Sequence, residues 1–316
     1  MIITWLTGGL GNQMFQYAAG LALAERRRTV LKLDIGWFRE DPAHDAHNRY
    51  ALSCFNITEQ FATQDEIDRV RGVTLTRIER WSISLARAFR LYQYARRHAS
   101  PGHWHQPPTF RFYPEFLEQP DNTYLSGMFQ SAQFFDPVAN LLRLHFSFRY
   151  PPPPEVAALA ERICSGPSAA VHFRRGDYVR NPDFAREIGV LDLDYYQRAV
   201  RLLRQRSPQA TLFVFSDDIE AVAREFKPPG PHVFVRCVDH WHPWDKIRLM
   251  ALCEHIAIAN STFSWWAAWL NRTPDKLVIA PDPWFAHSQH DSTDVVPALW
   301  TRLSRPVEAC RPGSSR

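Results

Sequence analysis

In the second half of the chain, short apolar runs alternate with longer amphipathic stretches, and this alternation restricts the fold more than any other feature. The apolar runs predict strands at residues 169–173, 211–215, 232–235, 255–259 and 276–280. Helical spacing between the runs predicts helices at residues 194–205, 219–226, 244–253 and 262–270. Strands that are apolar throughout and joined by helices form a parallel sheet with helices on both faces. The second half is therefore predicted to be a doubly wound α/β domain.

The start of the chain shows the same arrangement once. An apolar run at residues 2–6 is followed by Gly8 and Gly9, then by helical spacing at residues 12–28 and a second apolar run at residues 30–33. This order of strand, glycine turn, helix and strand places backbone amides at the helix start, where they can meet an anion. We therefore expect another α/β domain in the first half.

The length of the chain supports two domains. A chain of 316 residues is too long for one ordinary core and fits two domains of about 150 residues each. The proline run from Pro151 to Pro154 is stiff and extended. We expect the boundary at this run, with an N-terminal domain at residues 1–150 and a C-terminal domain at residues 155–316.

A dinucleotide-binding turn is the alternative interpretation of the N-terminal glycines. Gly9 and Gly11 supply two of its three glycines, and Asp34 follows the second strand where a ribose ligand is expected. Met14 occupies the third position, where close packing of helix on strand requires glycine. This mismatch disfavours an NAD(P)-dependent oxidoreductase, and the polar pair Asn12-Gln13 favours hydrogen bonds to a different ligand.

Polar side chains gather at the carboxyl ends of four successive strands predicted in the second half. They are His172, Arg174, Arg175, Ser216, Asp217, Asp218, Asp239, His240, Asn260, Ser261 and Thr262. In a parallel sheet these ends lie at one edge, where α/β proteins bind ligands in a crevice. The sequence therefore predicts a ligand site at this edge.

The residue types at this edge indicate a nucleotide. Guanidinium groups make bidentate contacts to phosphate oxygens, so Arg174 and Arg175 favour a diphosphate. A carboxylate such as Asp217 can accept hydrogen bonds from guanine, and a helix that begins near Ser261 can bind phosphate through its backbone amides. Two alternatives stay open: the arginine pair is an exposed basic turn, and one of the two neighbouring aspartates only caps a helix.

A metal site is not expected. Asp192 and Asp194 have the Asp-x-Asp spacing with which many nucleotide-sugar transferases hold a divalent ion, but capping of the following helix explains them better. Because two arginines are available for the diphosphate, a metal ion is unnecessary. We expect neither a metal nor a cofactor.

Composition and charge narrow the setting. The five cysteines are scattered and form no CxxC pair, which is typical of a reducing compartment. The apolar N-terminal run lacks a basic start and is interrupted by glycines, so we expect neither a signal peptide nor a membrane span, and a cytoplasmic protein. A net charge of +4 is too small to indicate nucleic acid.

The segment from Arg69 to Arg111 carries nine arginines and one acidic residue, Glu79. A basic amphipathic helix is able to lie on an anionic membrane surface, which makes this segment the candidate for peripheral contact with the inner membrane. A surface helix whose arginines are merely solvated is favoured over that contact. His103 and His105 have one residue between them, which suits a strand face better than a metal pair.

Four blocks in series resemble one family. They are residues 8–17 (GGLGNQMFQY), 172–178 (HFRRGDY), 215–218 (FSDD) and 260–266 (NSTFSWW). With them the chain is similar to the bacterial α-1,2-fucosyltransferases of glycosyltransferase family 11, from its start to about Trp284. Residues 41–120 are the least similar, and Ala267 stands where glycine is frequent in the family.

The resemblance implies a GT-B arrangement, in which two doubly wound, Rossmann-like α/β domains face each other across a cleft. It implies inverting, metal-independent transfer of L-fucose from GDP-β-L-fucose to the 2-hydroxyl of a terminal galactose, in an oligosaccharide or a lipid-linked glycan. The N-terminal domain is then the acceptor side, and the C-terminal domain binds the donor. A non-catalytic nucleotide- or glycan-binding protein is the alternative from another class.

The resemblance also implies roles for individual residues. Arg174 contacts the diphosphate, which makes it the catalytic residue that stabilises the departing GDP. His172 and Asp217 contact guanine. Asp177 is the nearest candidate for the base that takes the acceptor proton, although a salt bridge to Arg175 is favoured. The residues expected to bind the donor are Gly11, Asn12, Gln13, His172, Arg175, Asp217, Asn260, Ser261, Thr262 and Ser264.

Overall fold

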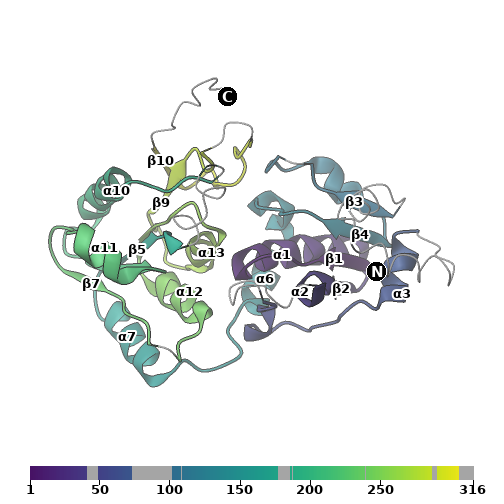
Figure 1. Cartoon of the computed structure of the whole chain (residues 1–316), viewed down its shortest axis with the longest axis horizontal. Coiled ribbons are helices and arrows are strands. Elements are labelled where there is room, and N and C mark those ends of the chain that lie inside the picture. Colours follow the sequence, from purple (N-terminus) through teal and green to yellow (C-terminus); the bar gives the residue numbers. More distant parts are fainter. Residues whose placement is uncertain are drawn as a thin grey trace, which may run out of the picture. The chain divides into compact units, whose positions relative to one another are not determined.

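The structure, a computed structural model, describes residues 1–40, 49–72, 102–107, 109–176, 186, 188–238, 240–286 and 290–305. The chain divides into two compact units, Met1–Tyr150 and Pro151–Arg316, and each unit contains a parallel β-sheet with packed helices (Figure 1). The α/β class predicted from the sequence is therefore confirmed. No helix within the described ranges is long and apolar enough to cross a membrane.

Among the residues that the structure describes, the sheet of the first unit has four parallel strands in the order β2-β1-β4-β3. Their bounds are β1 Ile2–Trp5, β2 Leu31–Asp34, β3 His103–His105 and β4 Thr123–Ser126. The strands predicted at residues 2–6 and 30–33 correspond to β1 and β2. His103 and His105 lie on a strand, as their spacing predicts.

Helix α1 (Leu10–Arg27) packs closely on β1 because Gly20 has no side chain. A Cβ atom at Gly20 would lie 2.1 Å from Oγ1 of Thr4, so even alanine has no room there. A dinucleotide-binding turn would require glycine for such packing at the position of Met14, whereas here a glycine further along the helix allows it. The middle of α1 therefore lies directly against β1 at Thr4 and close to Leu31 of β2.

The opposite face of this sheet is covered by α3 (Gln64–Val70), which begins with a capping box formed by Thr63 and Glu66. Ile67 of α3 packs in a small apolar cluster with Ile3 and Tyr124. Because side chains alternate along a strand, Ile3 and Thr4 of β1 face opposite helices. The remaining α-helices described in this unit are α2 (Gly36–Glu40) and α6 (Ala139–His145), with 3₁₀ turns at Leu52–Cys54, Pro114–Glu118, Ala132–Phe134 and Asp136–Val138.

The described part of the second unit contains a sheet of six parallel strands in the order β10-β9-β8-β5-β6-β7. Their bounds are β5 Ser168–Phe173, β6 Thr211–Ser216, β7 His232–Phe234, β8 His255–Ala257, β9 Val278–Asp282 and β10 Thr301–Ser304. The first five correspond to the five predicted strands. Strand β10 was not predicted, because it is mostly exposed at the sheet edge and lacks an apolar run.

Four helices described in the second unit correspond to the predicted ones. They are α10 Leu193–Arg206, α11 Ile219–Glu225, α12 Pro243–Leu252 and α13 Thr262–Leu270. Helix α7 (Pro154–Cys164) was not predicted. Pro154 is the first residue of α7, so the last proline of the run begins a helix, where its missing N–H costs nothing. The core packs Val171 and Phe173 of β5 against Tyr196 of α10, whose ring stacks on that of Phe173 at 3.6 Å.

The strand order contains a topological switch point at β5. The chain runs outward from β5 through β6 and β7, and then returns to the other side of β5 to form β8. The connections that leave the carboxyl ends of β5 and β8 therefore diverge. In open α/β sheets the crevice at such a point is where ligands bind.

Candidate functional site

Arg174 and Asp217 meet at the carboxyl ends of two neighbouring strands. Phe173, the last residue of β5, pairs with Ser216, the last residue of β6, so the residues that follow them leave the sheet side by side. Nη1 of Arg174 lies 3.0 Å from Oδ2 of Asp217, and both side chains are mostly buried. The ion pair fixes the guanidinium at the edge of the sheet beside the switch point.

Backbone groups complete the surroundings of Asp217. Oδ1 accepts a hydrogen bond from the backbone N–H of Arg175 at 2.9 Å. The backbone of Gly176 approaches so closely that a Cβ atom there would lie 2.7 Å from Oδ2. Burial by itself raises the pKa of Asp217, but the Arg174 guanidinium and the two backbone amides outweigh it and lower the pKa below its usual value. Asp217 is therefore a carboxylate at neutral pH.

His172 is the buried polar residue of β5, with only 3% of its surface exposed. Burial lowers its pKa to about 3, and the positive charges of Arg174 and Lys246 act in the same direction against the opposing effect of Asp217. The imidazole is therefore neutral. Its Nδ1 has no hydrogen-bond partner in the part of the chain that the structure describes. The ring lies 5.9 Å from that of Phe263 in the first turn of α13, so it borders the switch point.

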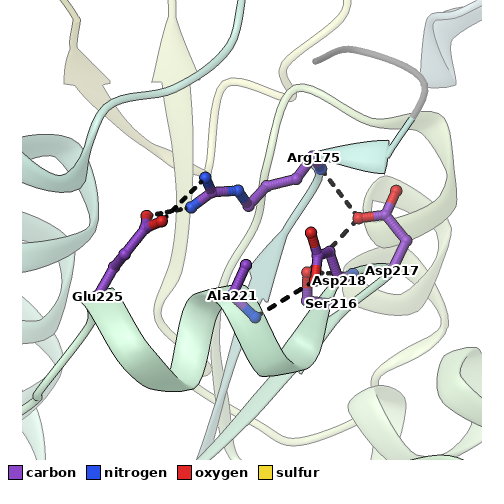
Figure 2. Close-up of polar contacts among 6 residues, drawn as sticks. All are labelled: Arg175, Ser216, Asp217, Asp218, Ala221 and Glu225. Atoms are coloured by element: carbon purple, nitrogen blue, oxygen red, sulfur yellow. Dashed lines mark hydrogen bonds and ion pairs between the residues drawn. The ribbon is translucent and has the colours of Figure 1, made fainter. Parts of the chain in front are cut away.

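The side chain of Arg175 points away from this cluster, as Figure 2 shows. Its guanidinium forms an ion pair with Glu225 at the end of α11, with Nη2 lying 3.4 Å from Oε1. The two adjacent arginines therefore have different partners. Arg174 and Asp217 are brought together as predicted, whereas the Arg175 guanidinium joins the start of the loop to α11.

The neighbouring aspartates Asp217 and Asp218 also have different partners. Asp218 is the N-cap of α11, and its Oδ1 accepts a hydrogen bond from the backbone N–H of Ala221 at 3.2 Å (Figure 2). The backbone N–H of Asp218 donates to Oγ of Ser216 at 3.0 Å. The prediction that one aspartate only caps a helix is therefore confirmed for Asp218.

The polar residues after β8 mostly serve the backbone. Nδ2 of Asn260 donates to the carbonyl oxygens of Ile188 and Gly189, at 3.0 and 2.9 Å. Oγ of Ser264 is fully buried and donates to the carbonyl oxygen of Ser261 at 3.3 Å. Ser261 is the N-cap residue of α13, but its side chain makes no capping hydrogen bond. Of the four predicted residues, Thr262 is the half-buried one at the start of the helix.

Two basic residues near this edge were not predicted. Nζ of Lys246 on α12 donates to the carbonyl oxygen of Ser216 at 3.0 Å, which brings a positive charge beneath the end of β6. Arg305 is buried, and its Nη2 donates to the carbonyl oxygen of Ile188 at 2.8 Å. It therefore binds the same backbone carbonyl as Asn260. Neither Lys246 nor Arg305 carried a signal in the sequence that marks it as part of the site.

In the first unit, the amide of Gln13 is occupied by the backbone. Its Nε2 donates to the carbonyl oxygens of Gly8 and Arg49 at 2.9 and 2.8 Å, and its Oε1 accepts from the N–H of Ala51 at 2.9 Å. Gln13 thus holds the segment at residues 49–51 against the glycine turn. Gly11 is buried within α1, and Asn12 is half-buried at the turn, where it contacts Gln130. Gln130 was not predicted.

The carboxylate proposed for a dinucleotide site is also occupied by its own unit. Oδ1 of Asp34 accepts from the N–H of Gly36 at 2.8 Å, and Oδ2 accepts from the hydroxyl of Tyr124 at 2.7 Å. Asp34 therefore closes β2 and fixes the start of α2. This arrangement gives no support to a ribose ligand at this position.

The Asp-x-Asp pair lies at the start of α10. Asp192 is the N-cap and accepts a hydrogen bond from the N–H of Tyr195 at 2.8 Å, which confirms the predicted capping role. Asp194 forms an ion pair with Arg198 one turn later, at 2.7 Å. Within the described ranges, no group of three or more His, Cys, Asp or Glu side chains is arranged to hold a metal ion.

Some predicted residues lie outside the described ranges. They are Asp177, Asp239 and most of the arginine-rich segment, from residue 73 to residue 101. The candidate base and the candidate membrane contact therefore stay predictions. His240 is described and lies on the surface, with Nε2 at 3.4 Å from Oε2 of Glu155.

A guanidinium, a carboxylate and a neutral imidazole at the switch point of an α/β sheet form an arrangement that is suited to a phosphorylated ligand at the carboxyl edge. Comparison with known proteins specifies the class. The family model described as glycosyl transferase family 11 matches residues 109–303. The chain belongs to this family and is a glycosyltransferase, as the four sequence blocks predict.

Three relatives indicate the range of reactions. The O-antigen biosynthesis glycosyltransferase WbnK of Escherichia coli is 31% identical over 299 residues, which cover 89% of this chain and 94% of the relative. An α-1,2-colitosyltransferase of Escherichia coli is 29% identical over 318 residues, covering 96% and 99%. A galactoside α-(1,2)-fucosyltransferase 1 of Saimiri sciureus is 27% identical over 154 residues, covering 46% and 42%.

Proposed function

We propose that this chain is a galactoside α-1,2-L-fucosyltransferase. It transfers L-fucose from GDP-β-L-fucose to the 2-hydroxyl of a terminal galactose in a glycan, with inversion and without a metal ion. Membership of family 11 supplies the reaction class. The single observation that carries the donor assignment is the Arg174–Asp217 ion pair beside the neutral His172, at the switch point of the second unit.

Arg174 binds the diphosphate of the donor in this proposal. A guanidinium has five N–H donors in a planar fork, so it can keep its contact with Asp217 while it binds two phosphate oxygens. Asp217 holds the guanidinium at 3.0 Å, which reduces the rotamer freedom that binding would otherwise have to remove. The diphosphate therefore meets a positive charge that is already oriented.

Asp217 and His172 recognise the guanine base. Each carboxylate oxygen has two lone pairs, so Asp217 can accept from guanine while it keeps its contacts with Arg174 and Arg175. The unpartnered Nδ1 of His172 supports its role as a ligand contact, because buried polar atoms in folded proteins are nearly always hydrogen-bonded. A neutral imidazole can both donate and accept, which suits a base better than a phosphate.

The chemical step breaks the bond between C1 of fucose and the phosphate oxygen, and forms a bond from C1 to O2 of galactose on the opposite face. Positive charge develops on the sugar ring, and negative charge develops on the departing GDP. The Arg174 guanidinium stabilises this negative charge where it appears. The galactose hydroxyl loses its proton to a base, for which Asp177 is the candidate from the sequence.

Colitose is a second candidate for the transferred sugar, because one relative with nearly full coverage is named an α-1,2-colitosyltransferase. Colitose is L-fucose without its 3-hydroxyl, so the GDP group, the anomeric carbon and the inversion are the same for both donors. The two candidates differ only in the pocket around that hydroxyl. The name of the O-antigen relative supports a polysaccharide precursor as the acceptor.

The experiment that tests this proposal measures thermal stability with GDP, GDP-fucose, GDP-colitose, UDP and NADH, each with EDTA and with magnesium. A ligand at about a hundred times its dissociation constant raises the free energy of unfolding by about 2.7 kcal/mol. We expect a shift with GDP and the GDP-sugars that survives EDTA, followed by transfer to β-galactosides. A shift with UDP alone, or a shift that requires magnesium, contradicts the proposal.

A further inference from the structure

Gln130 is a buried side chain in the first unit whose hydrogen bonding is incomplete. Only 6% of its surface is exposed. Its Nε2 donates to Oδ1 of Asn12 at 3.2 Å, but its Oε1 has no hydrogen-bond partner among the residues that the structure describes. A buried amide oxygen without a hydrogen-bond partner lowers the stability of the folded protein. We therefore expect a donor from outside the protein to bind it.

The backbone around Gln130 is firmly held. Phe129 adopts a left-handed conformation with φ 51°, which is unfavourable for a residue with a bulky side chain. Oε1 of Gln106 accepts from the backbone N–H groups of Met128 and Phe129 at 2.9 and 2.7 Å. The ring of Phe129 packs on Trp104 at 5.7 Å. The turn therefore presents Gln130 in one orientation, and a strained backbone of this kind is a common feature of ligand sites.

Asn12 offers the complementary group. It lies half-buried in the first turn of α1, where its side chain folds back over Gly8, whose φ is +70°. A Cβ atom at Gly8 would lie 2.8 Å from Nδ2 of Asn12, so the glycine keeps room for this amide. Nδ2 has no hydrogen-bond partner in the described part of the chain. The two amides, which are joined by the hydrogen bond from Nε2 of Gln130 to Oδ1 of Asn12, thus offer one donor and one acceptor.

We propose that Asn12 and Gln130 together bind one hydroxyl group of a sugar substrate. A hydroxyl donates one hydrogen bond and accepts others, so it satisfies Oε1 of Gln130 and Nδ2 of Asn12 at once. A phosphate offers acceptors alone and leaves Oε1 of Gln130 unpaired, although the start of α1 would otherwise suit an anion. Exchanging the O and N atoms of both amides leaves the same combination of one donor and one acceptor.

This inference rests on the proposed function and deepens it, because it names a residue that determines specificity for a sugar hydroxyl. The hydroxyl belongs to the transferred sugar or to the acceptor galactoside. Sites built to hydrogen-bond a hydroxyl discriminate strongly against the deoxy analogue, because the protein group is then left unpaired. Removing one hydroxyl at a time therefore identifies the partner.

The test measures kcat/KM of the full-length enzyme with GDP-fucose and its 2-, 3- and 4-deoxy analogues, and with a β-galactoside and its 3-, 4- and 6-deoxy analogues. One analogue should lose about tenfold or more with the wild-type enzyme. Gln130→Met keeps a similar side-chain volume. In this variant the kcat/KM values of that analogue and its parent should differ little, because neither substrate can form the hydrogen bond to residue 130. Gln133→Met is the matched control, since Gln133 lies exposed in the same segment and should retain the wild-type pattern.

Each outcome decides the inference. If the analogue whose kcat/KM recovers to that of its parent in Gln130→Met is a donor analogue, Asn12 and Gln130 bind a hydroxyl of the transferred sugar. If it is an acceptor analogue, they bind a hydroxyl of galactose. If the wild-type enzyme is active but every analogue loses the same factor in kcat/KM with Gln130→Met as with wild type, the inference is wrong. A buried water then satisfies Oε1 of Gln130. If Gln130→Met fails to fold, Asn12→Ala supplies the same comparison from the half-buried partner. A wild-type enzyme that transfers from none of these donors overturns the proposed function, and this inference with it.

Discussion

Arg174 is the residue whose surroundings explain most of the proposed chemistry. Its guanidinium is fixed by Asp217, which is in turn fixed by the backbone N–H of Arg175. A charge held in place before the substrate arrives stabilises a transition state better than one that must reorganise. The carboxylate offsets part of this positive charge, but it also holds the guanidinium at the edge of the sheet, so that little reorganisation is needed when the substrate arrives.

Replacing Arg174 with alanine should lower kcat by about 10²–10³-fold, the range seen when one preorganised donor to a developing negative charge is removed. Arg174→Lys should fall nearly as far, because an ammonium cannot span two phosphate oxygens while it also holds Asp217. Steady-state kinetics with GDP-fucose and a galactoside measures both. Arg236→Ala is the control, since Arg236 pairs with Glu220 on the surface. Full activity of Arg174→Lys would show that a single positive charge is sufficient.

His172 makes stability depend on pH. Its folded-state pKa of about 3 lies below the ordinary value of 6.5. Between pH 6.5 and pH 3, the imidazole is therefore protonated in the unfolded chain but neutral in the folded chain. The contribution is complete above pH 6.5 and is lost as pH falls toward 3. The wild-type free energy of unfolding should therefore decline below pH 6.5 by up to about 1.4 kcal/mol per pH unit more steeply than that of His172→Asn.

Urea denaturation at several pH values between 5 and 8 measures this difference. The lowered pKa of Asp217 does not interfere, because its contribution is present above the ordinary carboxyl range and is lost only in stronger acid. Gln133→Asn is the control, since Gln133 is exposed and carries no titratable group, and it should leave the wild-type slope unchanged. Equal slopes for the wild-type protein and His172→Asn would mean that the buried imidazole is protonated in the folded state.

At the scale of elements, the helices after the strand ends begin in different ways. Helices α10 and α11 have aspartate caps, Asp192 and Asp218, whereas α13 begins at Ser261 without a side-chain cap. A cap satisfies a backbone N–H that would otherwise be unpaired. The two aspartate caps are therefore structural. The start of α13, where the ring of Phe263 lies near that of His172, has backbone amides without a side-chain cap for the donor in the proposed function.

The cap of α10 gives a direct test of the Asp-x-Asp pair. Asp192→Ala should lower the free energy of unfolding by about 1 kcal/mol, the usual cost of losing an N-cap, and leave transfer activity unchanged. Asp194→Ala is the matched control and should cost about 0.5 kcal/mol or less, because its ion pair with Arg198 is exposed. Thermal denaturation and activity with EDTA or magnesium measure both variants. Loss of activity that magnesium restores would instead assign the pair to a metal.

At the scale of the whole molecule, the groups assigned to GDP come from one unit. His172 and Arg174 follow or belong to β5, Asp217 follows β6, and the sheet that carries them has its own apolar core. The contacts within Pro151–Arg316 define it as a compact unit. The nucleotide site therefore depends on strand order within this unit.

The fragment of residues 151–316 should consequently bind GDP by itself. We expect a cooperative thermal transition that shifts upward with GDP in the presence of EDTA, but no sugar transfer, because the N-terminal unit is missing. Calorimetry of the fragment and of the full chain compares their dissociation constants, which should agree within about tenfold. The same fragment with Arg174→Ala is the control and should show little shift. A folded fragment without any GDP response would place part of the nucleotide site in the first unit.

The amino-acid sequence by itself determined most elements of the second unit, all but α7 and β10 among those described, and the edge at which its polar residues gather. Helix α13 has the predicted bounds, and five of the six strands were predicted, because apolar periodicity reports burial directly. It also determined that Arg174 and Asp217 lie together, since the carboxyl ends of neighbouring parallel strands meet at one edge. These inferences need only local patterns and the rules of parallel sheets.

Only the tertiary structure decided which polar residues are free to meet a ligand. Arg174 and Arg175 are adjacent in sequence, yet one pairs with Asp217 and the other with Glu225, 50 residues away. The side chain of Gln13 is hydrogen-bonded to the backbone at residues 49–51. Gln130, which belongs to no sequence motif, forms a hydrogen bond to Asn12, 118 residues away. Hydrogen-bond partners are chosen among groups that folding brings together, so a one-dimensional pattern shows which residues are polar but not which hydrogen bonds remain unmade.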